Sequence, residues 1–259
     1  PAYRRDDYRS IAARIESEAR PGDAILLSAP NQWEVFTYYY RGSAPVYPAP
    51  YRPTHDEAAA WVAEVMTAHD SLFVLYWGDQ ESDPERHIER ALARQAYKAG
   101  ETWITSVRYA RYGTGPQPAH PDAEASLSFG ARINLAGYAL PEGPVRPGSI
   151  VPLTLFWRAE SRPAQRYKVF VHVLDTDGHL VAQTDREPVG GLLPTDRWAP
   201  GETIIDRYGV SLPADLRPGP YTVIAGLYDF SGDRLTVTGP DGTPRDHVTL
   251  GTLNAGPPQ

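Results

Sequence analysis

Hydrophobic residues in the first 112 positions follow two alternating spacings. Near the start they recur every three or four residues, as on one face of a helix, at Tyr8, Ile11, Ala12, Ile15 and Ala19. The run AILLSA, residues 24–29, is apolar without interruption and predicts a short buried strand. Helical spacing then returns, and we expect a second helix, ending near Gly42, with an apolar face made of Trp33, Phe36, Tyr39 and Tyr40.

A third helix is predicted by a capping motif. Thr54 and Glu57 have the T-x-x-E spacing in which each side chain satisfies a backbone N–H of the other residue. Behind them lies a helical apolar face made of Ala58, Trp61, Val62, Val65 and Met66. The run LFVLYW, residues 72–77, predicts a second buried strand.

The remaining part of this region predicts one more helix and two more strands. Ser82 and Glu85 form another expected capping box, with Pro84 in the first turn, ahead of Ile88, Leu92 and Ala96. The segments PVYPAP, residues 45–50, and TWITSVRYA, residues 102–110, are expected to be an edge strand and a closing strand. Helices alternating with short apolar strands favour parallel pairing through right-handed crossovers. Residues 1–112 are therefore predicted to form a small three-layer α/β domain with a mainly parallel sheet.

The pattern changes after Gly113. Residues 113–125, GTGPQPAHPDAEA, are rich in Pro, Gly and Ala and have no hydrophobic period, so we expect a linker. From residue 126 onward, alternate residues are hydrophobic between turn signals. Clear examples are Val151, Leu153, Leu155 and Trp157 in one segment, and Val169, Val171 and Val173 in the next. About seven or eight such strands predict that residues 126–259 form an antiparallel β-sandwich.

The composition excludes some classes of binding partner and some kinds of site. The formal net charge is −7 and the hydrophobic content is 41%, which indicates a folded chain and argues against nucleic acid or an anionic membrane surface as the main partner. No cysteine is present, so disulfides, thiol catalysis and cysteine metal sites are excluded. The apolar runs are far shorter than the roughly 20 residues of a membrane-spanning helix. The chain begins at Pro1, which we expect of a fragment or a processed chain.

Three stretches together resemble a known family of membrane enzymes. They are residues 7–42, DYRSIAARIESEARPGDAILLSAPNQWEVFTYYYRG; residues 72–103, LFVLYWGDQESDPERHIERALARQAYKAGETW; and residues 170–229, FVHVLDTDGHLVAQTDREPVGGLLPTDRWAPGETIIDRYGVSLPADLRPGPYTVIAGLYD. They are similar to the C-terminal extracytoplasmic region of bacterial GT-C class glycosyltransferases, the group that resembles protein O-mannosyltransferases. The resemblance covers nearly the whole chain and rests on overall pattern, because none of these stretches is a catalytic signature.

The resemblance implies an accessory role. In that family the catalytic carboxylates lie in the first extracytoplasmic loop, beside transmembrane helices that bind a polyprenyl-phosphate sugar donor. The present chain has no such helices, so no catalytic residue is carried over and no cofactor or metal is expected. The implied partners are the transmembrane part of the same parent protein and a glycan or glycosyl acceptor.

The first candidate binding residues come directly after the strand at residues 24–29. Asn31, Gln32 and Glu34, with the face of Trp33, would suit a sugar at the carboxyl end of a parallel strand. The alternative is that Asn31 caps a helix whose aromatic residues are core. Helical spacing favours the cap, and Gln32 and Glu34 stay as candidate ligands.

Acidic and histidine-containing segments carry weaker signals. Asp79, Glu81, Asp83 and Glu85 lie after the strand at residues 72–77, but a capping box explains them better than an acid–base pair. DTDG, residues 175–178, begins like a calcium loop, yet the segment after it supplies neither the further oxygen ligand nor the closing Glu, which favours a hairpin turn. No pair of histidines has the i, i+4 spacing of a helical zinc site, and His172 is expected in the core.

The segment GGLLPTDRWAPGE, residues 190–202, supplies the last candidate. Asp196, Arg197 and Trp198 would make a small platform for a sugar, whereas the alternative has Trp198 closing one end of the sandwich. The alternative is favoured, because loops of sandwiches often turn an aromatic side chain inward.

We therefore expect a non-catalytic, extracytoplasmic region of a membrane glycosyltransferase, which covers the catalytic face and helps to bind the acceptor. A second hypothesis is an independent carbohydrate-binding protein that uses the sandwich. A third and weaker hypothesis is an α/β enzyme that uses Asp79 and Glu81.

Overall fold

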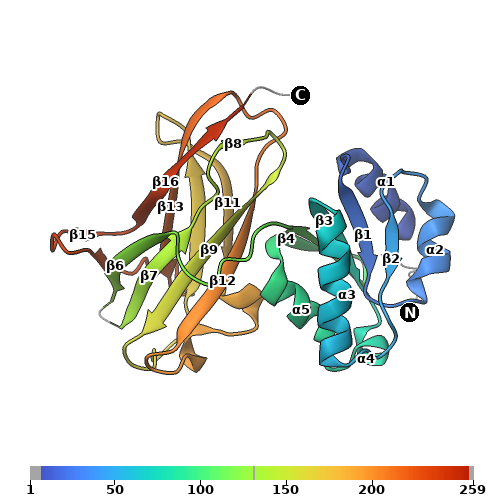
Figure 1. Ribbon diagram of the computed structural model, residues 1–259, viewed down its shortest axis with the longest axis horizontal. Coiled ribbons are helices and arrows are strands. Elements are labelled where there is room, and N and C mark those ends of the chain that lie inside the picture. The colour runs from blue at the N-terminus through green and yellow to red at the C-terminus, as the bar shows by residue number, and fades with distance from the viewer. Residues whose placement is uncertain (1–6, 131, 257–259) are drawn as a thin grey trace. The chain divides into compact units, whose positions relative to one another are not determined.

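The computed structural model describes residues 7–130 and 132–256 (Figure 1). The chain separates into two compact units, Pro1–Gly115 (unit 1) and Pro116–Gln259 (unit 2). This division falls inside the segment 113–125 that the sequence predicts as a linker. The ends of that segment nevertheless belong to strands, because β5 spans Val107–Gly113 and β6 spans Ala123–Phe129.

Unit 1 contains a mixed sheet with strands in the order β4, β5, β3, β1, β2. The other strands are β1 Asp23–Leu27, β2 Val46–Pro48, β3 Ser71–Tyr76 and β4 Tyr97–Ile104. β1 pairs in parallel with β2 and β3, whereas β5 pairs antiparallel with β3 and β4. The sheet is therefore not mainly parallel. The predicted single strand 102–110 is two strands, since Thr105 adopts a left-handed conformation (φ 55°) and the chain turns back there.

Helices of unit 1 pack against alternate side chains of the strands. Their bounds are α1 Tyr8–Glu18, α2 Gln32–Tyr39, α3 His55–Ala68, α4 Asp79–Ser82 and α5 His87–Gln95. Buried residues of α1 and α2 share a cluster with Ile25 and Leu27 of β1. Those of α3 and α5 share another with Ala24 and Leu26 of the same strand. Successive side chains of a strand point to opposite faces, so one buried strand supplies both clusters.

One of the two predicted capping boxes is present. Thr54 and Glu57 cap α3 reciprocally, as predicted. The predicted box of Ser82 and Glu85 is wrong, because Ser82 ends α4 and its hydroxyl donates to the carbonyl of Gly78. The Asp83 carboxylate instead accepts the first backbone N–H groups of α5, at 2.8 and 2.9 Å. Arg86, directly before α5, has a left-handed conformation (φ 57°). The turn that it makes brings the carboxylate of Asp83, four residues before the helix, to the helix N-terminus.

Unit 2 contains two sheets. Sheet I has the strand order β15, β14, β6, β7, β9, β12, and sheet II has the order β11, β10, β13, β16, β8. Their pairings within unit 2 are antiparallel except that of β16 with β8. Further bounds are β7 Ile133–Ala139, β8 Pro144–Val145, β9 Ile150–Ala159, β10 Lys168–Leu174, β11 Leu180–Arg186, β12 Thr203–Ser211, β13 Gly219–Tyr228, β14 Val237–Thr238, β15 Pro244–Arg245 and β16 Val248–Ala255, with 3₁₀ helices η1 Val189–Gly191 and η2 Thr195–Arg197.

The two sheets of unit 2 share one hydrophobic core, as in a β-sandwich. All the hydrophobic residues predicted to point inward from β9 and β10 belong to it: Val151, Leu153, Leu155 and Trp157, with Val169, Val171 and Val173. The period-two pattern thus identified the inward faces of both strands correctly. No helix in the described ranges, 7–130 and 132–256, has the length and apolar character needed to cross a membrane.

Candidate functional site

The residues after β1 serve mainly the packing of unit 1. Gln32 is fully buried; its Oε1 accepts the backbone N–H of Ala29 (3.1 Å) and its Nε2 donates to the Tyr8 hydroxyl (3.0 Å). Asn31 occupies the N-cap position of α2 but makes no capping hydrogen bond with its side chain. Asn31 and Glu34 are both exposed. Of the three candidate ligands in this segment, Gln32 is already occupied by its intramolecular partners.

The aromatic residues of α2 divide between core and surface. Phe36 and Tyr40 stack on each other and are buried, as predicted. Trp33 and Tyr39, expected on the same buried face, are 42% and 41% exposed. α2 has only eight residues. A helix this short buries only a narrow apolar stripe, and the side chains on either side of that stripe, among them Trp33 and Tyr39, lie in solvent.

The acidic residues after β3 have separate environments. Asp79 is partly buried and accepts a hydrogen bond from the Ser28 hydroxyl at the end of β1 (2.7 Å). Burial raises the pKa of Asp79, and the bond from Ser28 opposes this shift. Glu81 is exposed, and Asp83 is occupied as the cap of α5. The geometry therefore does not support the Asp79–Glu81 pair as acid and base.

The loop before β12 turns its tryptophan inward. Trp198 is 1% exposed, its Nε1 donates to the carbonyl of Leu193 (3.1 Å), and its ring centroid lies 6.4 Å from that of Trp157. A ring enclosed in this way offers no face to a sugar. Asp196 is partly buried and its backbone carbonyl accepts a hydrogen bond from Arg162. These contacts favour the structural interpretation of this loop.

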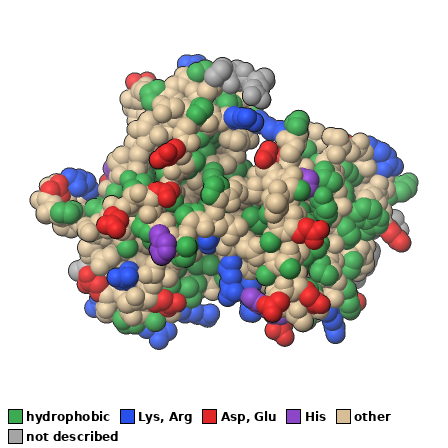
Figure 2. Space-filling model, in the orientation of Figure 1, with side chains coloured by type: hydrophobic (Ala, Val, Ile, Leu, Met, Phe, Trp, Pro, Cys, Tyr) green, Lys and Arg blue, Asp and Glu red, His purple; other side chains and the backbone are tan. Residues whose placement is uncertain are grey.

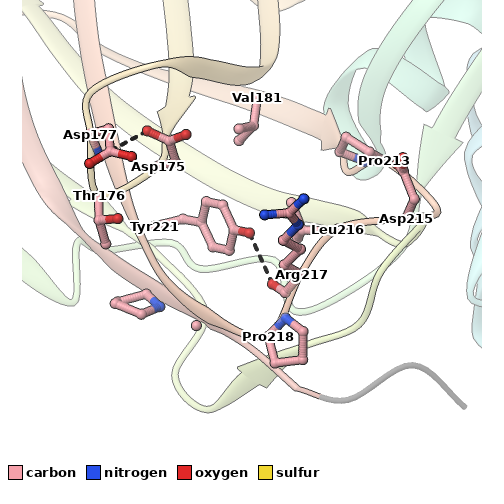
Figure 3. Close-up of a pocket in the computed structure, with 12 residues that line it drawn as sticks. Asp175, Thr176, Asp177, Val181, Pro213, Asp215, Leu216, Arg217, Pro218 and Tyr221 are labelled. Carbon is pink, nitrogen blue, oxygen red and sulfur yellow. Dashed lines mark hydrogen bonds between the residues drawn. The ribbon is translucent and has the colours of Figure 1, made fainter.

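A pocket of about 610 Å³ opens at one end of unit 2 (Figure 3). One side of the pocket is the turn between β10 and β11, and the other side is the segment that joins β12 to β13. The turn is the hairpin predicted from DTDG, since β10 and β11 pair antiparallel across it. The residues that line the pocket are Asp175, Thr176, Asp177, Val181, Pro213, Asp215, Leu216, Arg217, Pro218, Gly219, Pro220 and Tyr221.

Hydrogen bonds fix the shape of this pocket. One carboxylate oxygen of Asp175 accepts the backbone N–H groups of Asp177 (2.9 Å) and His179 (2.8 Å), and these bonds to His179 and Asp177 lower the pKa of Asp175. Tyr221 lies between the two sides of the pocket and its hydroxyl donates to the carbonyl of Arg217 (2.9 Å), as Figure 3 shows. The turn and the opposite segment are therefore each held by side chains that also line the pocket.

Three charged side chains remain available to a ligand. The carboxylates of Asp177 and Asp215 and the guanidinium of Arg217 are exposed, and within the described part of the chain none of these three groups makes a hydrogen bond or an ion pair. Val181, Leu216 and the tyrosine ring supply apolar surface between them. Two acceptors, one donor and apolar surface meet in one cavity.

The same turn brings together three side chains of the kinds that bind metal ions. Asp175, Asp177 and His179 place one ligand atom each within 4.8 Å of one another. Calcium takes six to eight oxygen ligands, whereas this group offers two carboxylates and one imidazole, and one oxygen of Asp175 already accepts two backbone N–H groups. The donor set does not fit a calcium site.

The sequence patterns do not predict the pocket. Asp215, Arg217 and Tyr221 lie in the segment ADLRPGPY, where the prolines and glycine predict only a turn. The acid, base and aromatic residue grouped in that turn were the available signal. On the face of the molecule in Figure 2, acidic and basic side chains are interspersed, with no broad area of one sign.

Comparisons with known proteins found similarity to solved structures alone. No protein-family model matches the chain. No curated protein matches it either. Among solved structures, the chain is similar to one described as the "Crystal structure of the C-terminal domain of wzt", with 13% sequence identity and a TM-score of 0.36 over 54% of this chain and 84% of that one. At these values the likeness carries no argument about function.

Proposed function

We propose that unit 2 binds a glycan in the pocket between the β10–β11 turn and the segment before β13. The observation that carries the proposal is the convergence of the Asp177 and Asp215 carboxylates and the Arg217 guanidinium around an apolar floor. Among the described residues, none of these three charged groups forms a hydrogen bond or an ion pair. Sugar hydroxyls both donate and accept hydrogen bonds, and the ring C–H groups are apolar. The pocket provides a complement for each of these features.

The binding is expected to be weak. The pocket is open to solvent and its three free charged groups are exposed, so each has to be ordered and partly dehydrated when a sugar binds. These costs consume much of the gain from a few hydrogen bonds, and we expect a dissociation constant on the order of 1 mM for a single sugar unit.

We infer further that the chain is the non-catalytic, extracytoplasmic region of a polyprenyl-phosphate-sugar-dependent membrane glycosyltransferase. The resemblance of residues 7–42, 72–103 and 170–229 to that family supports this inference. In this role unit 1, with helices α1 and α2 in one cluster and α3 and α5 in another, would be a three-layer α/β domain. Unit 2 would hold the glycosyl acceptor near the catalytic face of the transmembrane part.

An independent carbohydrate-binding protein is the second candidate, because the pocket lies wholly in unit 2. The coding sequence upstream of Pro1 separates the two. Hydrophobic segments of about 20 residues each would support the glycosyltransferase, and a signal peptide directly before Pro1 would support the independent binder. Under the first candidate, the isolated chain should show no sugar transfer from a polyprenyl-phosphate donor, and turnover would overturn the accessory role.

Ligand-observed NMR tests glycan binding. Methyl glycosides of mannose, glucose and galactose are offered to the whole chain and to the variants Arg217→Ala and Asp215→Ala. Arg197→Ala is the matched control, since Arg197 is also an exposed arginine of unit 2 but lies outside the pocket. We expect binding of at least one sugar, lost in both pocket variants and retained in the control. Binding by none of the sugars, or equal binding by all variants, would overturn the proposal.

A further inference from the structure

A second surface of unit 2 combines aromatic rings with positive charge. Val169, Val171 and Leu227 point into the core. The residues that alternate with them along β10 and β13 therefore point to the other face of sheet II. The outer patch is defined here as five residues on or beside that face: Lys168, Phe170, Tyr228, Phe230 and Arg234.

The floor of the outer patch is rigid. The Phe170 ring lies over Gly226 of β13, where an added Cβ would lie only 2.4 Å from the ring. The Arg234 guanidinium packs on the ring, with its Cζ 4.4 Å from the centroid. The Tyr228 ring is the neighbour in the sheet, at 6.3 Å between centroids. The His172 ring also lies 4.8 Å from that of Phe170, so Phe170 is enclosed by its neighbours and supports the residues around it.

The rim of the outer patch is open. Phe230 lies just after β13 and is 61% exposed, the largest aromatic exposure in unit 2 within the described residues. The turn that carries it is fixed, because one oxygen of Asp229 accepts the backbone N–H groups of Ser231 (2.8 Å) and Asp233 (3.0 Å). An exposed ring on a fixed turn is a suitable surface for stacking a ligand.

One cation of the patch has no anionic partner. Lys168 places its Nζ 5.1 Å from the Phe230 ring centroid and 5.9 Å from that of Tyr228. The neighbouring arginines are both neutralised, Arg166 by Glu187 and Arg234 by Asp246. Within the described ranges Lys168 forms no ion pair, so its ammonium is available to an anion from outside.

We propose that the outer patch binds an acidic sugar unit, one that carries a carboxylate on its ring. The carboxylate would pair with Lys168, while the apolar face of the ring stacks on Phe230. The Tyr228 hydroxyl donates to the Asp185 carboxylate (3.4 Å), so it would meet a ring hydroxyl only as an acceptor. Charge complementarity selects this ligand over a neutral sugar, because an unpaired ammonium beside two rings gains an ion pair only from an anion. The outer patch shares no residue with the pocket and would bind a different class of sugar. This proposal rests on the proposed function only in its assumption that the chain binds glycans.

The test compares an acidic with a neutral oligosaccharide. Trigalacturonate and galactotriose are titrated calorimetrically into the whole chain, into Lys168→Gln and Phe230→Ala, and into the pocket variant Arg217→Ala. Arg197→Gln is the control, since it removes one exposed positive charge elsewhere in unit 2. We expect trigalacturonate to bind, to weaken about fivefold or more in both patch variants, and to lose affinity as salt is raised. Affinity unchanged in Arg197→Gln would assign the effect to the patch.

Two outcomes overturn the proposal. Either trigalacturonate does not bind, or it binds equally to Lys168→Gln and the unchanged chain. Loss of binding in Arg217→Ala alone would place the acidic sugar in the pocket instead, which refutes the outer patch but supports the proposed function. Conversely, suppose that trigalacturonate binds to the outer patch while Arg217→Ala and Asp215→Ala bind every sugar as the unchanged chain does. That result would refute glycan binding in the pocket and leave the outer patch standing.

Discussion

Asp206 of β12 is a carboxylic acid with no exposed surface. One of its oxygens accepts the backbone N–H of Val189 (2.8 Å) and the other accepts the hydroxyl of Tyr208 (2.6 Å). Burial raises its pKa, against the opposing effects of the Tyr208 hydrogen bond and the Arg186 charge. Its protonation therefore affects the stability of unit 2.

Replacing Asp206 with Asn should change the pH dependence of stability. The folded-state pKa lies above the unfolded value of about 3.8, so the folded state binds the proton more tightly. The resulting stabilisation is present below the unfolded pKa and is lost as the pH rises through the folded pKa. Relative to Asp206→Asn, the unmodified chain should lose stability as the pH rises above about 4 and passes through the raised folded-state pKa of Asp206. Urea denaturation of both chains measures this, and a difference in unfolding free energy that stays constant with pH would contradict it.

Trp157 of β9 permits a simpler test. It is fully buried between the rings of Phe129 and Trp198, and Trp157→Ala should lower the free energy of unfolding by about 3–5 kcal/mol. The control is Trp103→Ala, since Trp103 is mostly exposed and its loss should cost about 0.5 kcal/mol or less. Equal denaturation midpoints for the two variants would show that β9 turns its other face to the core.

Single-residue environments were predictable where a strict period applied. Trp157 alternates with aliphatic residues on a long strand, so a shift of one position would have exposed the whole set. Trp33 lies on a helix of two turns, where spacing alone does not distinguish the core stripe from the residues beside it. Gln32 is buried by a partner from another element, the Tyr8 hydroxyl, which no local pattern can indicate.

At the scale of elements, the start of α5 depends on Asp83. Its carboxylate binds the backbone N–H groups of His87 and Ile88. Asp83→Ala should therefore lower the free energy of unfolding by about 1–2 kcal/mol. Glu85→Ala is the control, because Glu85 is largely exposed although its spacing predicts the cap. A larger loss in Glu85→Ala, measured by chemical denaturation, would restore the predicted capping box.

The two capping motifs differ in the residues on the C-terminal side of the cap. Thr54 leads directly into helical residues, and the local spacing was sufficient to predict the box. After Ser82 the chain contains Pro84 and the left-handed Arg86, so the three-residue spacing no longer spans one helical turn. The strand pairing of β5 was also not predictable, because a single left-handed residue, Thr105, converts one expected strand into a hairpin.

At the scale of the whole molecule, unit 2 should fold alone. It has its own core drawn from both sheets, and residues 116–259 should give a cooperative, two-state unfolding transition. The comparison is residues 126–259, which begin inside β6 and cut the strand that pairs with β7. Circular dichroism on urea titration should give a lower midpoint for the shorter fragment. An aggregated or unfolded product from residues 116–259 would contradict the division.

The sandwich was predictable from the sequence and the pocket was not. Alternation specifies which face of each strand is buried, and a run of alternating strands implies two facing sheets. The pocket instead requires that Asp177 and Arg217, forty positions apart, meet at one end of the fold. That meeting depends on the order of strands in the sheets, which the spacing of hydrophobic residues does not specify.

The distribution of lysines has a practical consequence. The sequence contains only Lys98 and Lys168, and Lys98 is buried with its ammonium 2.8 Å from Glu101. Apart from the α-amino group, an amine-reactive dye should therefore attach at Lys168 in the native chain, without the introduction of a cysteine. The reaction removes the positive charge of Lys168, so a ligand that pairs with this ammonium beside Phe230 should slow the labelling, and the rate of dye attachment would report on occupancy of the outer patch.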